Sequence, residues 1–233
     1  MSTDGFEGHR TMRDRRAVVT GLVGAGAMTL VGCGAQGRTA TVRFKVIARA
    51  RVNGAERVGE SVMEIWFKST PNSLSRMQLA TKYKGEAVIL DFGQRGAAYF
   101  LITDYVSILL SGFGVAPDRR SFDEAIPELK VLSGRISVPR DKLPKIAAFR
   151  DETTPSSVFE VDPQHFDRAF GPGVVFDGLD IEITDEPITR KIQDRLTWLE
   201  VGSTQRLQSS PPGKPMSSLG FGERIDHNWF LKR

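Results

Sequence analysis

Few residues of this chain carry side chains that could act as a catalytic base, a nucleophile or a metal ligand. Beyond residue 33 there are two histidines, His165 and His227. His227 stands between Asp226 and Asn228, a setting that a hydrolytic or metal site could use, although a histidine beside an aspartate is far more often a surface hydrogen-bonding group. Ser111 lacks the preceding glycine of a G-x-S-x-G nucleophile elbow. We therefore predict no catalytic residue, and the alternative is a hydrolase that uses His227 with a nearby carboxylate.

Acidic residues gather in one stretch, where five carboxylates fall within ten residues: Asp177, Asp180, Glu182, Asp185 and Glu186. Oxygen-rich clusters of this kind can bind Ca²⁺. However, alternation predicts Asp180 and Glu182 on the outward face of a strand. Asp185 and Glu186 suit the start of a helix, where negative charge is favourable. This structural explanation needs no ion, and we predict neither a metal nor a cofactor.

The most informative stretch runs from Arg13 to Gly34. A basic segment ending in Arg15 and Arg16 precedes the uncharged residues 17–32, and Cys33 follows. A positive segment, an apolar run and a small-residue end are the three parts of an export signal. The uncharged run of 16 residues is shorter than the about 20 residues of a comfortable membrane span. We therefore interpret residues 1–33 as an export signal.

The end of this signal, Leu30-Val31-Gly32-Cys33, resembles the lipobox of bacterial lipoprotein signal peptides. The resemblance implies that the thiol of Cys33 is acylated, that cleavage occurs before it, and that the protein is lipid-anchored in the cell envelope and faces the periplasm. Gly34 is not the aspartate that signals retention in the inner membrane, so the resemblance favours the outer membrane. Arg15-Arg16 is also a twin-arginine pair, and Sec and Tat export both remain open. Whether translation starts at Met1 or at Met12 also remains open.

Composition limits the binding surfaces, covalent links and domain sizes that this chain can have. The formal net charge is +4 over 233 residues, without the basic block expected of a nucleic-acid-binding surface. Cys33 is the one cysteine, so an acylated Cys33 would leave the mature chain without disulfides or thiolate metal ligands. Residues 34–40 are small and polar and predict a short tether. Residues 41–200 are long enough for a single domain with a sizeable core.

A hairpin opens the predicted domain. Apolar and basic residues alternate from Val42 to Val52, Asn53-Gly54 favours a tight turn, and residues 57–68 alternate again. A two-residue loop sets Phe44 against Met63. A four-residue loop also pairs apolar with apolar residues, so the sequence leaves the register open.

The first strand of this hairpin is strongly basic. One interpretation is that Arg43, Lys45, Arg49 and Arg51 contact anionic lipid head groups, at about 1 kcal/mol for each residue near the surface. We favour the other interpretation, in which these cations pair with Glu60 and Glu64 on a solvated sheet face.

Later segments predict an α+β fold that is mainly antiparallel, with a few short helices. Residues 106–113 could be strand or helix, whereas Asp162-Pro163 and Asp185 to Pro187 are typical helix starts, the second for a helix reaching Leu199. Residues 201–220 read as a loop or linker. The apolar residues within 221–233 suggest that the end of the chain docks on the core.

One further resemblance lies in the second half of the chain. The segments Val161-Asp162-Pro163, Phe170 to Val174, Ile181 to Thr189 and Arg195 to Leu199 resemble a family of uncharacterised proteobacterial proteins, whose members often carry lipoprotein or other export signals. The resemblance spans roughly residues 42 to 200. It implies no activity and no site residue.

Together these observations predict a membrane-anchored lipoprotein that serves as a non-catalytic binding or structural component of the cell envelope. Its predicted partners are the membrane, through the anchor on Cys33, and an envelope protein, but not nucleic acid. A carrier of a hydrophobic ligand is a further alternative, suggested by the apolar strands, although such strands usually form the core.

Overall fold

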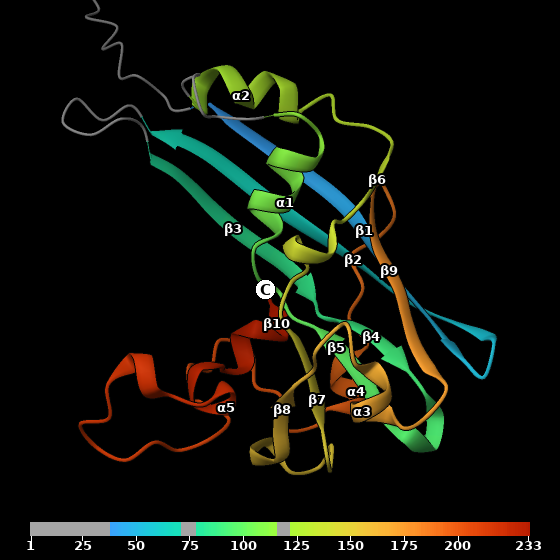
Figure 1. The fold of residues 1–233 in the computed structure, drawn as a ribbon. Coiled ribbons are helices and arrows are strands. Elements are labelled where there is room, and N and C mark those ends of the chain that lie inside the picture. The colour runs from blue at the N-terminus through green and yellow to red at the C-terminus, as the bar shows by residue number, and fades with distance from the viewer. Residues whose placement is uncertain (1–37, 71–77, 116–121) are drawn as a thin grey trace, which may run out of the picture. The chain divides into compact units, whose positions relative to one another are not determined.

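The computed structural model describes residues 38–70, 78–115 and 122–233 of the chain. The residues on which the signal prediction depends lie outside this part: Arg15, Arg16, Leu30, Gly32 and Cys33. Within it, ten strands form two antiparallel sheets, and the helices are short (Figure 1). The predicted fold class, α+β and mainly antiparallel, is therefore confirmed.

The larger sheet has six strands in the order β10-β3-β2-β1-β9-β6. Its bounds are β1 (Thr39–Val52), β2 (Ala55–Thr70), β3 (Gln78–Glu86), β6 (Arg135–Ser137), β9 (Val174–Ile183) and β10 (Leu231–Lys232). The predicted hairpin is β1–β2, and Phe44 faces Met63. Asn53 and Gly54 both have positive φ, 50° and 86°, as a two-residue hairpin turn requires. Of the two registers left open, the two-residue loop is therefore the right one.

The smaller sheet has the order β4-β5-β7-β8 and is covered on both faces. Its strands are β4 (Val88–Asp91), β5 (Ala97–Phe100), β7 (Ile146–Phe149) and β8 (Val158–Glu160). Every residue of β5 and β7 is buried. A strand buried on both faces does not alternate, which explains why residues 144–149 show little periodicity.

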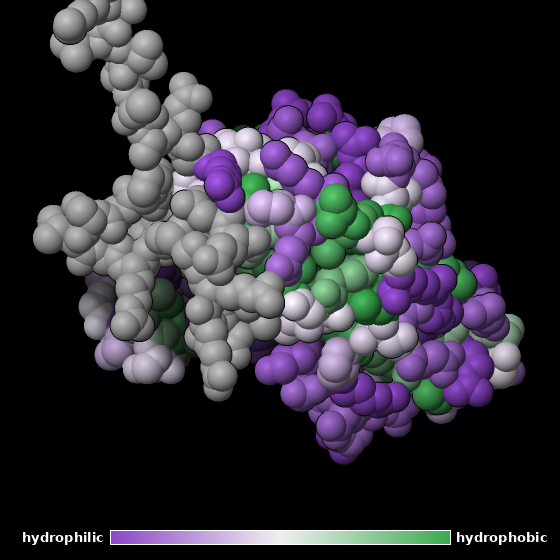
Figure 2. Space-filling view, turned by 90° about the horizontal axis from the view of Figure 1, so that it is seen from above, coloured by the Kyte–Doolittle hydropathy of each residue, from purple (hydrophilic) through white to green (hydrophobic). Residues whose placement is uncertain are grey.

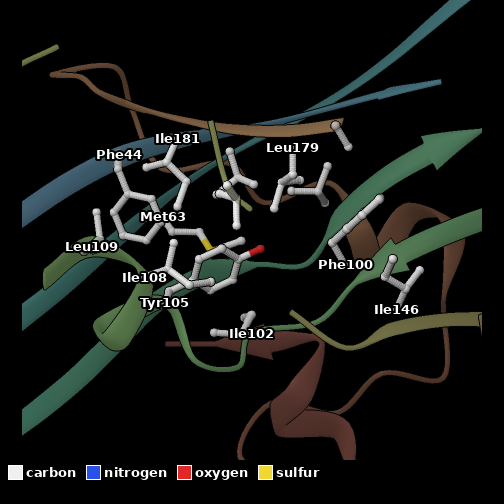
Figure 3. Packing of buried hydrophobic residues seen from close by; sticks show 14 of the residues in the cluster. Phe44, Met63, Phe100, Ile102, Tyr105, Ile108, Leu109, Ile146, Leu179 and Ile181 are labelled. Atoms are coloured by element: carbon white, nitrogen blue, oxygen red, sulfur yellow. The ribbon is translucent and has the colours of Figure 1, made fainter. Parts of the chain in front are cut away.

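Two hydrophobic clusters lie on opposite sides of this smaller sheet. The first fills the space towards the larger sheet and includes Phe44, Met63, Phe100 and Tyr105, which Figure 3 shows converging between strands and helix. All four are fully buried, and burying a side chain of this size contributes about 1.5–3 kcal/mol. The second cluster includes Tyr99, Phe149, Leu196 and Phe230.

The end of the chain docks on the second cluster, as the apolar residues of 221–233 suggested. Phe230 is fully buried, and its carbonyl accepts a hydrogen bond from the backbone N–H of Ala87 at 2.8 Å. Residues 201–220 also contribute, because Leu207 and Leu219 are each 6% exposed. This segment therefore packs against the domain.

Five α-helices lie within the described residues: α1 (Tyr105–Gly112), α2 (Phe122–Leu129), α3 (Phe166–Phe170), α4 (Ile192–Arg195) and α5 (Phe221–Arg224). Short 3₁₀ turns accompany them: η1 (Gly93–Arg95), η2 (Arg140–Lys142), η3 (Pro155–Ser157), η4 (Met216–Ser218) and η5 (His227–Trp229). Of the ambiguous residues 106–113, all but Phe113, which caps the end of α1, are thus helical. The helix expected after Asp162-Pro163 begins later, at Phe166, because Asp162 instead accepts a hydrogen bond from the backbone N–H of Gln164 and forms a turn.

The helix predicted from Asp185 to Leu199 is wrong for most of its length. Only Ile192–Arg195 is helical, and residues 184–191 form an irregular segment, here called the strap. The strap is fixed by tertiary contacts: the side chain of Thr189 bonds the hydroxyl of Ser61 at 2.8 Å and the backbone N–H of Val62 at 3.1 Å. Contacts of this kind, together with Pro187, override the local helical pattern.

Candidate functional site

The four basic residues of β1 are all paired with carboxylates. Arg43 Nη2 lies 2.8 Å from Glu64 Oε2, and Lys45 pairs with Glu186 of the strap. Arg49 pairs with Asp180, and Arg51 forms a bidentate contact with Asp177. The preferred interpretation, pairing rather than lipid contact, thus agrees with this geometry. Its expected partners were Glu60 and Glu64, of which only Glu64 holds one of these ion pairs.

Asp180 is the centre of the buried part of this network. Its side chain is 7% exposed, and it accepts hydrogen bonds from Arg49, from Arg135 Nε at 3.0 Å and Nη2 at 2.5 Å, and from Ser137 Oγ at 2.7 Å. Burial opposes ionisation of Asp180, but the bonds from Ser137, Arg49 and Arg135 outweigh it and lower the pKa of this carboxyl. Asp180 thus lies on the polar face of β9, opposite the buried Leu179 and Ile181, as alternation predicted, but the side chains of Arg49, Arg135 and Ser137 cover it.

The other predicted carboxylates have separate partners, and they do not converge on a common point. Glu182 lies 3.7 Å from Arg135, and Asp185 contributes its backbone carbonyl to Arg43 Nη1 at 3.3 Å. Among the described residues, no three His, Cys, Asp or Glu side chains are arranged to hold a metal ion. The acidic stretch thus forms side-chain contacts from β9 and the strap to β1 and β6.

The two histidines lie in different settings. His165 bonds Asp162 through Nδ1 at 2.6 Å at the surface, and this bond lowers the pKa of Asp162. His227 is 8% exposed, and its Nδ1 accepts a hydrogen bond from the backbone N–H of Glu200 at 2.9 Å. A ring nitrogen that accepts from a backbone N–H is not free to take a proton from a substrate.

A polar cluster that sequence reasoning missed lies around Glu152. Its carboxylate accepts from Tyr99 Oη at 2.9 Å and from Arg195 Nε at 2.7 Å, and its carbonyl accepts from Trp198 Nε1 at 2.7 Å. Burial, together with the charge of Glu152, raises the pKa of Tyr99. Local sequence gives no sign of this cluster, because its members come from β5, the β7–β8 connection, α4 and the residues that follow α4.

The backbone of β1 has an open edge near its start. The carbonyl of Arg38 accepts from Ser69 of β2, whereas the carbonyl of Arg43 accepts from Thr184. Even-numbered residues of β1 therefore bond β2, and odd-numbered residues face β9. Since β9 ends at Ile183, opposite Phe44, the backbone N–H and C=O of Thr41 have no strand partner among the described residues.

A cavity of about 230 Å³ lies at this open edge, and we call it the β1 notch. It is lined by β1, by one residue of β2, by the end of β9 and the strap, and by residues at and just after the end of α2: Thr41, Val42, Arg43, Glu64, Leu129, Lys130, Leu132, Ile183, Thr184 and Asp185. Two cations and two carboxylates are thus among the residues that line the notch. The Nε atom of Arg43 is buried and has no hydrogen-bond partner among residues 38–70, 78–115 and 122–233, which leaves one donor unused next to the notch.

A second cavity, of about 290 Å³, lies between η2, α3 and β9. Its one basic side chain, Arg140, already donates to the carbonyl of Phe176 at 3.3 Å. Neither cavity is lined by His227. Seen from the α2 end, the surface of the described residues is mixed, with hydrophilic side chains bordering smaller hydrophobic areas (Figure 2). The β1 notch is the stronger candidate, since it combines a cavity with open backbone groups.

The described residues include no helix that is both long and apolar enough to cross a bilayer. Comparison with family models, curated proteins and solved structures finds no match to this chain. The resemblances to bacterial lipoprotein signals and to the proteobacterial family therefore remain predictions.

Proposed function

We propose that this chain is a bacterial lipoprotein, anchored through Cys33 and facing the periplasm, whose domain is a non-catalytic binding component of the cell envelope. The observation that carries the proposal is the lipobox-like sequence Leu30-Val31-Gly32-Cys33, which lies six residues before the first residue of β1, Thr39. Gly34 favours the outer over the inner membrane.

A non-catalytic role is supported by the contacts that the potentially reactive side chains form within the domain. Asp177 and Asp180 hold Arg51 and Arg49, and His227 accepts from the backbone of Glu200. Each of these groups is engaged in contacts within the domain, in arrangements that stabilise loops and sheet packing.

For the partner, we propose an envelope protein that adds an extended segment to the open edge at Thr41. Extended segments bind exposed sheet edges through main-chain hydrogen bonds, and neighbouring pockets then select the side chains. The β1 notch supplies the pocket, where Lys130 and Asp185 could pair with charged side chains of a partner and Arg43 Nε could donate a further hydrogen bond.

The anchor is tested by fractionating cells that produce the wild type or Cys33→Ala. Membranes are washed in about 1 M salt, which shortens the range of electrostatic attraction to about 3 Å. We expect wild type to stay in the membrane fraction and Cys33→Ala to leave it. A wild type that washes off, or a variant that stays, would contradict the proposed anchor.

The partner site is tested with a photo-crosslinking residue at Lys130, which is exposed at the β1 notch. Thr41→Pro removes the N–H donor that faces the notch but spares the bonds to β2, whereas Thr41→Val keeps that donor. We expect Thr41→Val to retain the crosslinked product and Thr41→Pro to lose it. Equal crosslinking in both variants would exclude strand addition at this edge.

A further inference from the structure

Three lysines surround a tryptophan on the outer face of β2 and β3. Trp66 faces Lys82 across the two strands, and Glu64 faces Lys84. Lys68 lies two residues beyond Trp66 on the same face, and Lys82 Nζ lies 5.7 Å from the centre of the Trp66 ring. Lys82 and Lys84 are exposed, and Lys68 is half-buried. We call this surface the lysine face.

The charge of the lysine face differs from that of β1. The cations of β1 are neutralised by Glu64, Glu186, Asp180 and Asp177. In contrast, Lys68, Lys82 and Lys84 have no ion pair with any residue that the structure describes. The three lysines therefore carry uncompensated positive charge, as does Arg57, which lies apart from them near the β1–β2 turn.

The lysine face includes the residue that pairs with the start of β1, and the proposed anchor precedes that strand by only a few residues of sequence. Thr39, the first residue of β1, is paired with Lys68. Cys33 lies six residues before Thr39, so the connecting chain can span at most about 20 Å. Lys84 lies opposite Glu64, four residues before Lys68 along β2, which is about 13 Å further along the sheet. A domain tethered at Cys33 could therefore rest all three lysines on the membrane.

We infer that the lysine face docks the domain on an anionic phospholipid surface, with Trp66 at the interface. This inference rests on the proposed anchor, which brings the face to the membrane, but it assigns the contact to residues other than Arg43, Lys45, Arg49 and Arg51. Unpaired lysines near a surface of anionic lipid are attracted electrostatically, and tryptophan is enriched at membrane–water interfaces. Docking would fix the orientation in which the domain meets its partner.

The test uses the full chain carrying Cys33→Ala, so that binding does not depend on acylation. Its partition onto vesicles of phosphatidylglycerol and phosphatidylcholine is compared with that onto phosphatidylcholine alone. Replacing Lys68, Lys82 and Lys84 by glutamine should weaken partition onto the anionic vesicles about 100-fold, which corresponds to about 1 kcal/mol for each lysine. Trp66 emission should shift to the blue on anionic vesicles, and Trp66→Phe should abolish that change.

The matched control removes the same amount of charge elsewhere, through Lys142→Gln, Arg150→Gln and Arg224→Gln, at three exposed positions outside β2 and β3. Circular dichroism and urea unfolding establish that both triple variants are folded. We expect the control to bind anionic vesicles as the parent does.

Equal loss of binding in both triple variants would overturn the inference, as would equal binding to neutral and anionic vesicles. Soluble polyphosphate that binds the face as tightly as vesicles do would instead assign it to an acidic macromolecule. Failure of the anchor itself would be seen separately, in the fractionation of Cys33→Ala.

Discussion

The hydroxyl of Tyr105 gives a sharp test of the packing between the two sheets. Tyr105 is fully buried at the start of α1, and its Oη has no hydrogen-bond partner in the part of the chain that the structure describes. Figure 3 shows its ring among Met63, Ile102 and Ile108. A buried polar group without a partner costs about 1–3 kcal/mol of stability. Replacing Tyr105 by phenylalanine removes that cost and leaves the ring in place.

The expected gain follows from two opposing contributions. Removing the hydroxyl recovers the desolvation cost, and the oxygen leaves a void of about 10–15 Å³. At about 24 cal/mol per Å³, that void costs roughly 0.3 kcal/mol. We therefore expect Tyr105→Phe to raise the free energy of unfolding by about 1–2 kcal/mol, which corresponds to roughly 2–8 °C in Tm for a domain of this size.

The assay is urea unfolding followed by tryptophan fluorescence, with the midpoint compared at an unchanged m-value. Tyr99→Phe is the matched control, because the ring of Tyr99 is equally buried but its hydroxyl donates to Glu152 at 2.9 Å. That variant should lose about 1–3 kcal/mol, since Glu152 loses a partner. A Tyr105→Phe protein that is less stable than wild type would refute the reasoning and indicate that the hydroxyl bonds a group held inside the core.

Three further predictions concern the sheets. Asp180→Asn should lower stability by about 1–3 kcal/mol at neutral pH. The pKa of Asp180 is lowered in the folded state, so its contribution to stability is present above the unfolded pKa near 4 and is lost below it. The difference in stability between wild type and Asp180→Asn should therefore shrink as the pH falls below about 4. A difference that does not depend on pH would contradict this. Gly59→Ala should destabilise the domain by about 2 kcal/mol or more in thermal unfolding, because an added Cβ would lie 2.1 Å from the backbone oxygen of Ile89. If the variant were as stable as wild type, β4 would have to move away from Gly59. Glu86 accepts hydrogen bonds from the backbone N–H groups of Lys191 and Ile192 at 2.6 and 2.8 Å. Glu86→Ala should therefore lower the free energy of unfolding in urea by about 2 kcal/mol or more and should expose α4 to proteolysis. Intact packing of α4 in the variant would count against this role.

Sequence predicted best those parts of the fold in which local pattern and tertiary packing agree. The β1–β2 hairpin is such a case, because its alternation gives one apolar face and Asn53-Gly54 supplies the positive-φ turn. The exact register required the three-dimensional structure, because two loop lengths both pair apolar with apolar residues.

Prediction failed where distant contacts override local preference. From Asp185 onwards the sequence has a helical stripe, but Ser61, Val62 and Glu86 hold residues 189–192 from strands more than 100 positions away. The partners of Arg49 and Arg51 were missed for the same reason. Their carboxylates lie on β9, and sequence alone does not indicate that β9 pairs with β1.

The candidate site was the least predictable feature. The β1 notch exists because β9 ends at Ile183 while β1 begins at Thr39, which leaves Thr41 without a strand neighbour among the described residues. That difference in strand ends depends on register, which a single sequence does not give. The lysine face is similar: Lys82 and Lys84 gain significance from their position beside Trp66, not from a local motif.

The most direct test of the central claim is the mass of the first peptide of the mature protein, purified from membranes. We predict a peptide that begins at Cys33 and carries a diacylglyceryl group on its thiol, and none that contains residues 17–32. A peptide that spans Gly32 and Cys33 without added lipid would contradict the account, because the domain would then lack the anchor that brings it to the membrane.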